Sequence, residues 1–259
     1  MTTFKSTHHT DRKIIVIKLG GSTLEGLTEP FYEQIKALQQ QGYEIVITHG
    51  GGPAINRSLA KMGISSTIID GLRVTTNDMI AVVQQTLIGE VNPFVVAQLN
   101  AVGIAAVGLN GFDSHLIQAT AINEEVYGHV GEVQAVNTAL IDTLLQANVV
   151  PVIACIGVDE AHKPLNINGD TVACQVAKAI KAESLLLVTD VAGIRIEDEY
   201  QANVTAANIH TWIEQGHIYG GMIPKVKGAL QCLDAGIPSV QIVNEHLTGT
   251  TISEKELVK

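Results

Sequence analysis

The sequence contains few cysteines and few charged residues. The three cysteines, Cys155, Cys174 and Cys232, are odd in number and far apart, which excludes a disulfide framework and a cysteine-based zinc site. We therefore expect reduced thiols and a cytoplasmic protein. Charged residues make up 16% of the 259 residues, against about 25% in an average globular chain, while 46% are hydrophobic. That balance excludes wholesale disorder, which requires low hydrophobicity and high net charge.

Positive charge and long apolar runs are also scarce. The sequence contains 16 lysines and arginines and 26 aspartates and glutamates, so the net charge is −10. A field of this sign repels nucleic acids and anionic membranes, so any anionic ligand must be captured by local groups. The longest apolar run, residues 149–158, contains Pro151 and Gly157 and is far shorter than the roughly 20 residues that span a bilayer. We expect neither nucleic acid nor membrane as a partner.

Several common catalytic motifs are missing. The sequence has no G-x-x-x-x-G-K-[ST] loop and no G-x-G-x-x-G pattern, which excludes the usual nucleotide fingerprints. It also lacks the G-x-S-x-G elbow that an esterase would need beside the His49-Gly50-Gly51-Gly52 segment. The nine histidines show no H-x-x-x-H or H-E-x-x-H spacing, so we predict no metal held by protein ligands.

The remaining pattern alternates strands with helices. Continuous apolar strands between amphipathic helices indicate a mostly parallel sheet covered on both faces, which is an α/β fold. Around residues 118–134, apolar and polar residues alternate over short stretches, which predicts a hairpin. Strands are predicted at 14–18, 44–48, 104–109, 149–156, 184–189 and 239–243, and helices at 29–41, 78–87, 138–147, 170–182, 205–215 and 225–235.

Two of these strands end in glycine runs. Lys18-Leu19-Gly20-Gly21 follows the first strand, and His49-Gly50-Gly51-Gly52 follows the second. Glycine lets backbone N–H groups approach an anion closely, and a following helix N-terminus favours negative charge. Either loop alone is more often a simple turn. Two such loops at neighbouring strand ends favour a phosphate site.

Four charged residues accompany the loops. Lys18 either covers apolar surface with the aliphatic part of its side chain or places its ammonium group over a phosphate. Lys225 alone would be a surface lysine. The planar guanidinium of Arg73 suits a carboxylate, although a strand-edge salt bridge explains it equally well. Asp170 is either a helix N-cap or the group that positions two lysines.

Taken together, these segments resemble the amino acid kinase family. The resemblance covers residues 14 to about 252 and implies a three-layer αβα sandwich of the carbamate kinase type with two lobes. Residues 14–168 would bind the acyl-amino acid and dimerise, residues 169–259 would bind the nucleotide, and residues 1–13 would form a tail. The segments are Lys18–Gly21, His49–Pro53, Gly71–Thr75, Val107–Leu109 with Asp113, Gly128–Gly131, Asn166–Asp170, Thr189–Ile194, Gly221–Lys225 and Gly249–Thr250.

The Gly71–Thr75 and Gly128–Gly131 segments are most similar to family members that act on N-acetyl-L-glutamate. The resemblance implies ATP-dependent phosphorylation of its side-chain carboxylate to N-acetyl-L-glutamyl 5-phosphate, the second step of arginine biosynthesis, with Mg²⁺ held mainly by phosphate oxygens. Lys18 and Lys225 correspond to the transition-state lysines and Asp170 to the aspartate that orients them. The substrate residues would be Gly51, Gly52, Arg73 and Asn166, and the nucleotide residues Gly20, Gly21, Gly50, Asp190, Val191, Ala192, Gly193, Ile194, Arg195, His217, Ile218 and Tyr219.

Two positions depart from the family pattern, and other functions stay open. Ala192 stands where serine is frequent, and Pro224 precedes the lysine. A relative that phosphorylates glutamate, aspartate, carbamate or a nucleotide would share the lysines and glycines but lack the Arg73 segment. A non-catalytic sensor of arginine metabolites would lose Lys18, Lys225 or Asp170, and all three are present.

The segment before the first strand bears on regulation. Family members inhibited by arginine carry an additional N-terminal helix that links dimers into hexamers. Residues 1–13 contain only two sizeable apolar side chains, Met1 and Phe4, too few for the stripe of a docking helix. We therefore expect a homodimer that L-arginine does not inhibit, with residues 1 to about 12 loosely ordered.

Overall fold

A computed structural model describes residues 12–21 and 23–254. Eight strands form one central sheet in the order β14-β16-β15-β11-β1-β2-β8-β5. All neighbours are parallel except β15 and β16, so the sheet is mostly parallel, as predicted. Its strands are β1 (Ile14–Leu19), β2 (Glu44–His49), β5 (Ala106–Leu109), β8 (Val150–Ala154), β11 (Ser184–Val188), β14 (Asn203–Thr205), β15 (Ser239–Val243) and β16 (Gly249–Ser253).

Helices cover both faces of this sheet because its strands are apolar on both sides. In β1, Ile14 and Val16 belong to one core, whereas Ile15, Ile17 and Leu19 belong to the other. The first core is completed by α6 (Ala139–Gln146), α7 (Gly169–Ala179), α8 (Ala206–Glu214) and α9 (Met222–Asp234). The second is completed by α1 (Glu29–Gln40) and α4 (Asn92–Ala101). The three-layer sandwich is therefore confirmed.

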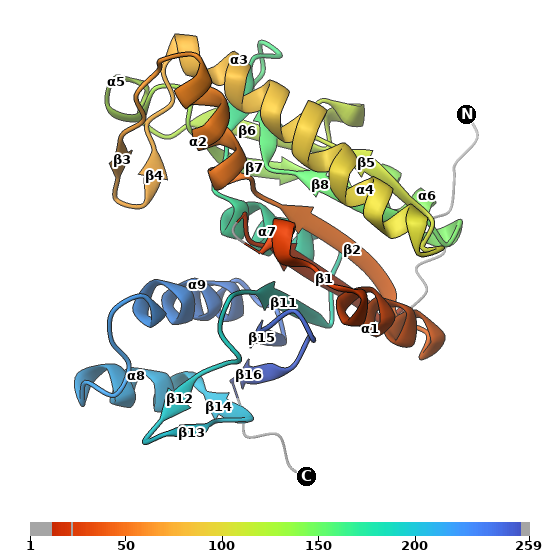
Figure 1. The fold of residues 1–259 in the computed structure, drawn as a ribbon, viewed down its shortest axis with the longest axis vertical. Helices are drawn as coiled ribbons and strands as arrows, with labels where there is room; N and C mark the ends of the chain where they lie inside the picture. Colours follow the sequence, from red (N-terminus) through yellow and green to blue (C-terminus); the bar gives the residue numbers. More distant parts are fainter. Residues whose placement is uncertain (1–11, 22, 255–259) are drawn as a thin grey trace, which may run out of the picture.

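Smaller elements surround the sheet. A second sheet in the order β10-β9-β6-β7 contains the predicted hairpin, with a short helix between its strands. Figure 1 places most of the N-terminal elements on one side of β1 and the C-terminal elements on the other. The remaining elements are β3 (Ile68–Ile69), β4 (Leu72–Arg73), β6 (Ile117–Ala121), β7 (Gly131–Val136), β9 (Ile156–Val158), β10 (Pro164–Asn166), β12 (Arg195–Ile196), β13 (Glu199–Tyr200), α2 (Gly52–Lys61), α3 (Asn77–Thr86), α5 (Glu124–Tyr127), and the single turns Leu24–Gly26 and Asp113–His115.

The structure differs from the prediction at three elements. The strand predicted at 149–156 splits at Cys155, because β8 belongs to the large sheet and β9 to the small one. The strand at 239–243 is not the last, since β16 returns antiparallel beside it. The helix predicted at 78–87 continues through a π-helical turn, Leu87–Val91, into α4.

This continuous helix, Asn77–Ala101, has a mean hydropathy of 1.3 and is long and apolar enough to cross a membrane by length and composition alone. A core helix of a globular protein passes the same test. Val83, Leu87 and Leu99 are fully buried in the two cores. We therefore read the helix as a packing element and not as a clear membrane span.

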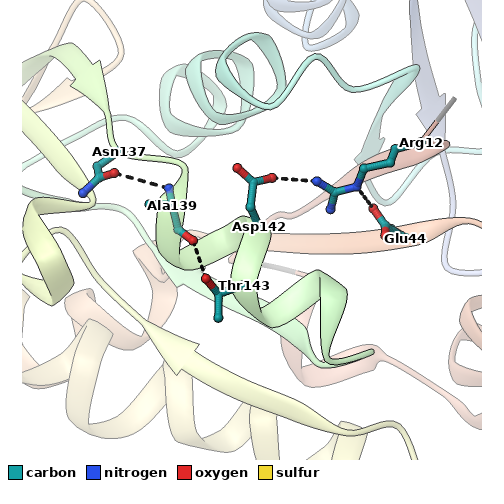
Figure 2. Close-up of polar contacts among 6 residues, drawn as sticks. All are labelled: Arg12, Glu44, Asn137, Ala139, Asp142 and Thr143. Atoms are coloured by element: carbon teal, nitrogen blue, oxygen red, sulfur yellow. Dashed lines mark hydrogen bonds and ion pairs between the residues drawn. The ribbon is translucent and has the colours of Figure 1, made fainter. Parts of the chain in front are cut away.

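Arg12 ties the start of β1 to two other elements (Figure 2). Its Nε lies 2.6 Å from Glu44 Oε2 in β2, and its Nη1 lies 2.7 Å from Asp142 Oδ1 in α6. Burial opposes the charge, but the hydrogen bonds to the two carboxylates outweigh it and raise the pKa of Arg12. The expectation of loose order is therefore wrong at Arg12. Residues 1–11 lie outside the described residues.

Candidate active site

The two glycine loops lie side by side at the carboxyl edge of the sheet. Strands β1 and β2 are parallel neighbours in which Leu19 pairs with His49, so both loops begin at the same level. The Gly50 N–H donates to Leu19 O at 3.3 Å. A Cβ at Gly21 would lie 2.7 Å from Pro53 Cδ and 2.8 Å from the Gly52 nitrogen, so the close approach of the loops requires glycine there.

Lys18 points from β1 towards the start of α7. Its Nζ lies 2.9 Å from Asp170 Oδ1, and only 15% of its side chain is exposed. The N-cap of α7 is Asn168, whose Oδ1 accepts hydrogen bonds from Asp170 N and Thr171 N. The N-cap alternative for Asp170 is therefore wrong. The Asp170 carboxylate instead lies in the first helical turn, where the helix dipole favours its charge.

Lys225 has a different partner. It lies in the first turns of α9, and its Nζ is 2.6 Å from Asp190 Oδ1 at the end of β11. The hydrogen bond from Lys225 lowers the pKa of Asp190. We expected Asp170 to orient both lysines, but the structure records its ion pair with Lys18 and places Lys225 on Asp190.

A cavity of about 190 Å³ brings the two pairs together. Two ammonium groups and the Gly20 backbone border one space at the carboxyl ends of parallel strands, the usual position of ligands in α/β sheets. Such a set of donors can neutralise a phosphate whose charge increases during transfer. The lining residues are Lys18, Gly20, Asp170, Leu187, Val188, Thr189, Asp190, Pro224, Lys225, Gly228 and Ile242.

Comparison with known proteins agrees with this geometry. Residues 13–244 match the model of the amino acid kinase family. The chain belongs to this family. An acetylglutamate kinase from Halalkalibacterium halodurans is 43% identical over 251 residues, which cover 93% of this chain and 96% of that protein.

Solved structures share the fold. The crystal structure of a protein from Streptococcus mutans UA159 is similar with a TM-score of 0.84 at 34% identity, over 93% of this chain and 99% of that one. Carbamate kinase from Giardia lamblia bound to AMP-PNP has a TM-score of 0.68 at 17% identity, covering 94% and 99% of the two chains. The latter likeness shows the fold alone.

Arg73 and Asn166, the two side chains expected to bind the acyl-amino acid, are linked by Thr75. The Thr75 hydroxyl donates to Arg73 O at 2.8 Å and accepts from Asn166 Nδ2 at 3.0 Å. Thr75 is fully buried. The Arg73 guanidinium donates to Ser66 Oγ and to Gly52 O, which brings it to the second glycine loop. Burial lowers the pKa of Arg73.

The predicted nucleotide residues after β11 are arranged unevenly. Asp190 borders the cavity, whereas Ile194 is buried and its N–H donates to Thr250 Oγ1 at 2.7 Å. A Cβ at Gly193 would lie 2.6 Å from the same hydroxyl. Arg195 extends into the β12–β13 hairpin, where it pairs with Asp198 at 2.6 Å.

Residues 217–219, the other predicted nucleotide segment, connect α8 to α9. Ile218 is buried in the first core, while 76% of Tyr219 is exposed. None of these three residues is among those that line the cavity of the two lysines in the described part of the chain. The structure therefore brings Lys18, Gly20, Asp170, Asp190 and Lys225 together and leaves residues 217–219 outside that group.

Sequence reasoning missed three buried polar residues that support the site. Thr75 and Thr250 were quoted only as parts of family segments, and Asn92 was not considered. Asn92 precedes Pro93, a combination that usually marks a turn, yet it lies inside the continuous helix and is only 6% exposed. Asn92 is a polar side chain next to the apolar residues Val91, Phe94, Val95 and Val96, which is the one signal that could have identified it, whereas Thr75 and Thr250 have polar neighbours in the sequence and give no such signal.

Proposed function

We propose that this chain transfers the γ-phosphoryl group of ATP to the side-chain carboxylate of N-acetyl-L-glutamate. The observation that carries the proposal is the single cavity bordered by Lys18, Asp170, Asp190, Lys225 and Gly20. The proposal is further supported by the relative named acetylglutamate kinase at 43% identity. The product, N-acetyl-L-glutamyl 5-phosphate, belongs to arginine biosynthesis.

The chemistry requires positioning and charge stabilisation and no general base, because a carboxylate is itself the nucleophile. Lys18 and Lys225 stabilise the negative charge on the transferring group, and backbone N–H groups of Gly20 and Gly21 add hydrogen bonds. The Gly50 N–H, which was also expected to bind phosphate, instead donates to Leu19 O. Asp170 keeps the Lys18 ammonium in place at 2.9 Å. In this scheme Asp190 releases Lys225 to the phosphate, since an exposed ion pair is weak.

Arg73, Asn166, Gly51 and Gly52 form the acyl-amino-acid site. The Arg73 guanidinium already lies against Gly52, with Nη2 3.5 Å from the Gly52 carbonyl. Its fork binds the α-carboxylate, a geometry that lysine cannot reproduce. Thr75 links the Arg73 backbone to the Asn166 side chain through its two hydrogen bonds.

The nucleotide is held by residues 169–259, and the substrate by residues 14–168. Residues 190–195 and 217–219 surround the base and ribose. The described residues contain no group of three or more histidines, cysteines, aspartates or glutamates arranged for a metal ion. We therefore assign Mg²⁺ to the phosphate oxygens, where it neutralises charge on the nucleotide.

A coupled assay of ADP release tests the proposal. N-acetyl-L-glutamate, L-glutamate, L-aspartate and carbamate are compared as acceptors with the same enzyme preparation. We expect turnover with N-acetyl-L-glutamate and background rates with the other three. Preference for another acceptor would assign the chain to a different kinase of the same family, and binding without ADP release would favour the sensor alternative.

We also propose a cytoplasmic homodimer that L-arginine does not inhibit. The dimer follows from the family resemblance, and residues 1–13 contain too few apolar side chains to form the stripe of a docking helix by themselves. Light scattering gives the molar mass, and activity is measured in parallel across an arginine titration. A hexamer with arginine inhibition would contradict both parts.

A further inference from the structure

Asn92 lies at the centre of a buried polar network behind the second glycine loop. It begins α4, directly after the π-helical turn Leu87–Val91, and the backbone irregularity of such turns often accompanies functional positions. Its Nδ2 is 2.9 Å from Val152 O, 3.4 Å from Leu109 O and 2.9 Å from His49 Nε2. One amide therefore connects the middle of β8 with the ends of β5 and β2, three neighbouring strands of the central sheet.

Gly108 provides the space for this amide. A Cβ at position 108 would lie only 1.8 Å from Asn92 Oδ1. The Asn92 side chain cannot easily move away, because its hydrogen bonds hold it in place. The Asn92 side chain and the missing side chain of Gly108 are thus complementary parts of one arrangement. That complementarity explains a glycine in the middle of β5, where a side chain would otherwise contribute packing.

The network determines which nitrogen of His49 carries the proton. Two carbonyl oxygens face the Asn92 amide group, so the atom directed at them is the donor nitrogen, and the same nitrogen faces His49 Nε2. Nε2 must therefore accept, which leaves the proton on Nδ1. Nδ1 then donates to Gly50 O at 2.9 Å. His49 is fully buried, and burial lowers its pKa to about 4, so the ring is neutral at pH 7.

The Gly50 carbonyl is part of the peptide that enters the loop. In a trans peptide the C=O and the following N–H point in opposite directions. A hydrogen bond that holds Gly50 O towards the His49 ring therefore directs the Gly51 N–H away from it. Glycine at 50, 51 and 52 would otherwise leave this peptide free to rotate.

We propose that Asn92 is a positioning residue that acts through the Nδ1–H tautomer of His49 to orient the Gly50–Gly51 peptide for catalysis. The proposal rests on the function assigned above to the glycine loop. Neither Asn92 nor His49 contacts the substrate in this scheme. Loss of either one lets the loop rotate, and a displacement of about 1 Å at a reacting centre can lower the rate about 100-fold.

Four single variants and one double variant of the full chain separate this role from a general contribution to folding. Asn92→Ala removes the donor. Asn100→Ala is the matched control, because Asn100 lies on the same helix and bonds Ala106 at the opposite end of β5. His49→Asn retains an amide donor near the place of Nδ1, whereas His49→Gln retains an acceptor near the place of Nε2 and loses that donor.

We expect Asn92→Ala to lower kcat by about 10- to 100-fold, with a smaller change in KM for N-acetyl-L-glutamate. Asn100→Ala should lower the Tm without lowering kcat. His49→Asn should be several times more active than His49→Gln, because it still donates to Gly50 O. In the His49→Asn background, the additional change Asn92→Ala should have a much smaller effect on kcat, since the path through His49 is already interrupted.

Equal kcat for Asn92→Ala and Asn100→Ala, or the same loss from Asn92→Ala in both backgrounds, would overturn the proposal. If Asn92→Ala does not fold, the order of His49→Asn and His49→Gln decides. A third readout does not require activity. The ¹⁵N spectrum of His49 should show a protonated Nδ1 and a bare Nε2 at neutral pH, and the opposite tautomer would overturn the proposal even if wild-type turnover is absent. Absent turnover with the expected tautomer would instead contradict only the proposed function.

Discussion

The two lysine–aspartate pairs of the candidate site differ sharply in their surroundings. Lys18 lies in the central strand β1, between β2 and β11, and is 15% exposed. Lys225 lies on α9 and is 28% exposed, and its partner Asp190 is 73% exposed. Lys18 is enclosed by the sheet and α7 although 49% of its partner Asp170 is exposed, whereas both members of the Lys225–Asp190 pair are more exposed than their counterparts.

This difference indicates a division of labour. A charge with little access to water interacts more strongly with its neighbours, so the Lys18 side of the site is pre-arranged for a phosphate. Exposed ion pairs are worth about 0–1 kcal/mol, so Lys225 can leave Asp190 for a ligand at little cost. The Lys18 side therefore provides a constant frame, and the Lys225 side completes the site when the nucleotide binds.

The strongest test of this comparison removes each lysine. We expect Lys18→Ala and Lys225→Ala each to lower kcat by about 10²–10³-fold, because each removes one preorganised charge donor. KM for N-acetyl-L-glutamate should change much less in both variants. Steady-state kinetics with a coupled ADP assay measure the effect.

Lys227→Ala is the control, since Lys227 lies on the same helix as Lys225 and does not line the cavity in the described residues. Near-normal kcat for Lys18→Ala would remove Lys18 from the mechanism. Normal kcat for Lys225→Ala alone would show that the Lys18 side suffices, and the division of labour would then be wrong.

The second prediction concerns the protonation of His49, which lies at the end of β2, next to the strand of Lys18. In the unfolded chain His49 is protonated below about pH 6.5, its ordinary pKa. In the folded chain its pKa is about 4, so it is protonated only below that pH. The contribution of His49 to stability is therefore fully present above pH 6.5 and is lost as the pH falls towards 4. Between pH 7 and pH 5 the free energy of unfolding should fall by about 2 kcal/mol from this group.

Urea denaturation at several pH values measures this contribution. His49→Asn has no titrating group at this position. Its free energy of unfolding should therefore fall by about 2 kcal/mol less than that of the wild type between pH 7 and pH 5. Asn100→Ala, which removes no ionisable group, is the control and should leave the pH dependence as in the wild type. Identical pH profiles for wild type and His49→Asn would show that His49 is not held neutral.

Arg73 extends the comparison to substrate specificity. Arg73→Lys retains the charge but loses the planar fork, and a hydrogen bond to a charged group contributes about 1.5–3 kcal/mol. KM for N-acetyl-L-glutamate should therefore rise at least about 10-fold, while KM for ATP changes little. Arg57→Lys is the matched control. Equal increases in both KM values would place the acyl-amino-acid site elsewhere.

The frame of the site was predictable from the sequence because its signals are local. An apolar run followed by Lys18 and glycines predicted the strand, the loop and the cation without knowledge of any contact. The contacts themselves depend on tertiary packing. Nothing near Lys225 in the sequence indicates Asp190 as its partner in preference to Asp170, because the pairing depends on how α9 lies against β11.

Asn92 shows the same limit more clearly. The helix was predicted only as far as residue 87, and Asn-Pro close to Gly89 is a local signal for a helix end. Tertiary packing outweighs that local preference, because Val91, Val95 and Leu99 are buried against the sheet. The buried amide of Asn92 then finds partners on three strands that are distant in the sequence.

The smallest effect is expected at Asp190, and it tests the exposed side of the comparison directly. The hydrogen bond from Lys225 lowers the pKa of Asp190, so the pair stabilises the fold above the ordinary carboxylate pKa of 3.8 and loses this contribution as the pH falls further. Because Asp190 is 73% exposed, solvent screens the pair, and Asp190→Asn should lower the free energy of unfolding at pH 7 by less than about 1 kcal/mol. Asp198→Asn, which breaks another exposed pair at 2.6 Å, serves as the control and should have an effect of the same small size. Urea denaturation of both variants measures the difference. A loss well above 1 kcal/mol at Asp190 alone would mean that Lys225 is held as firmly as Lys18, and the C-terminal side of the site would then be pre-arranged as well.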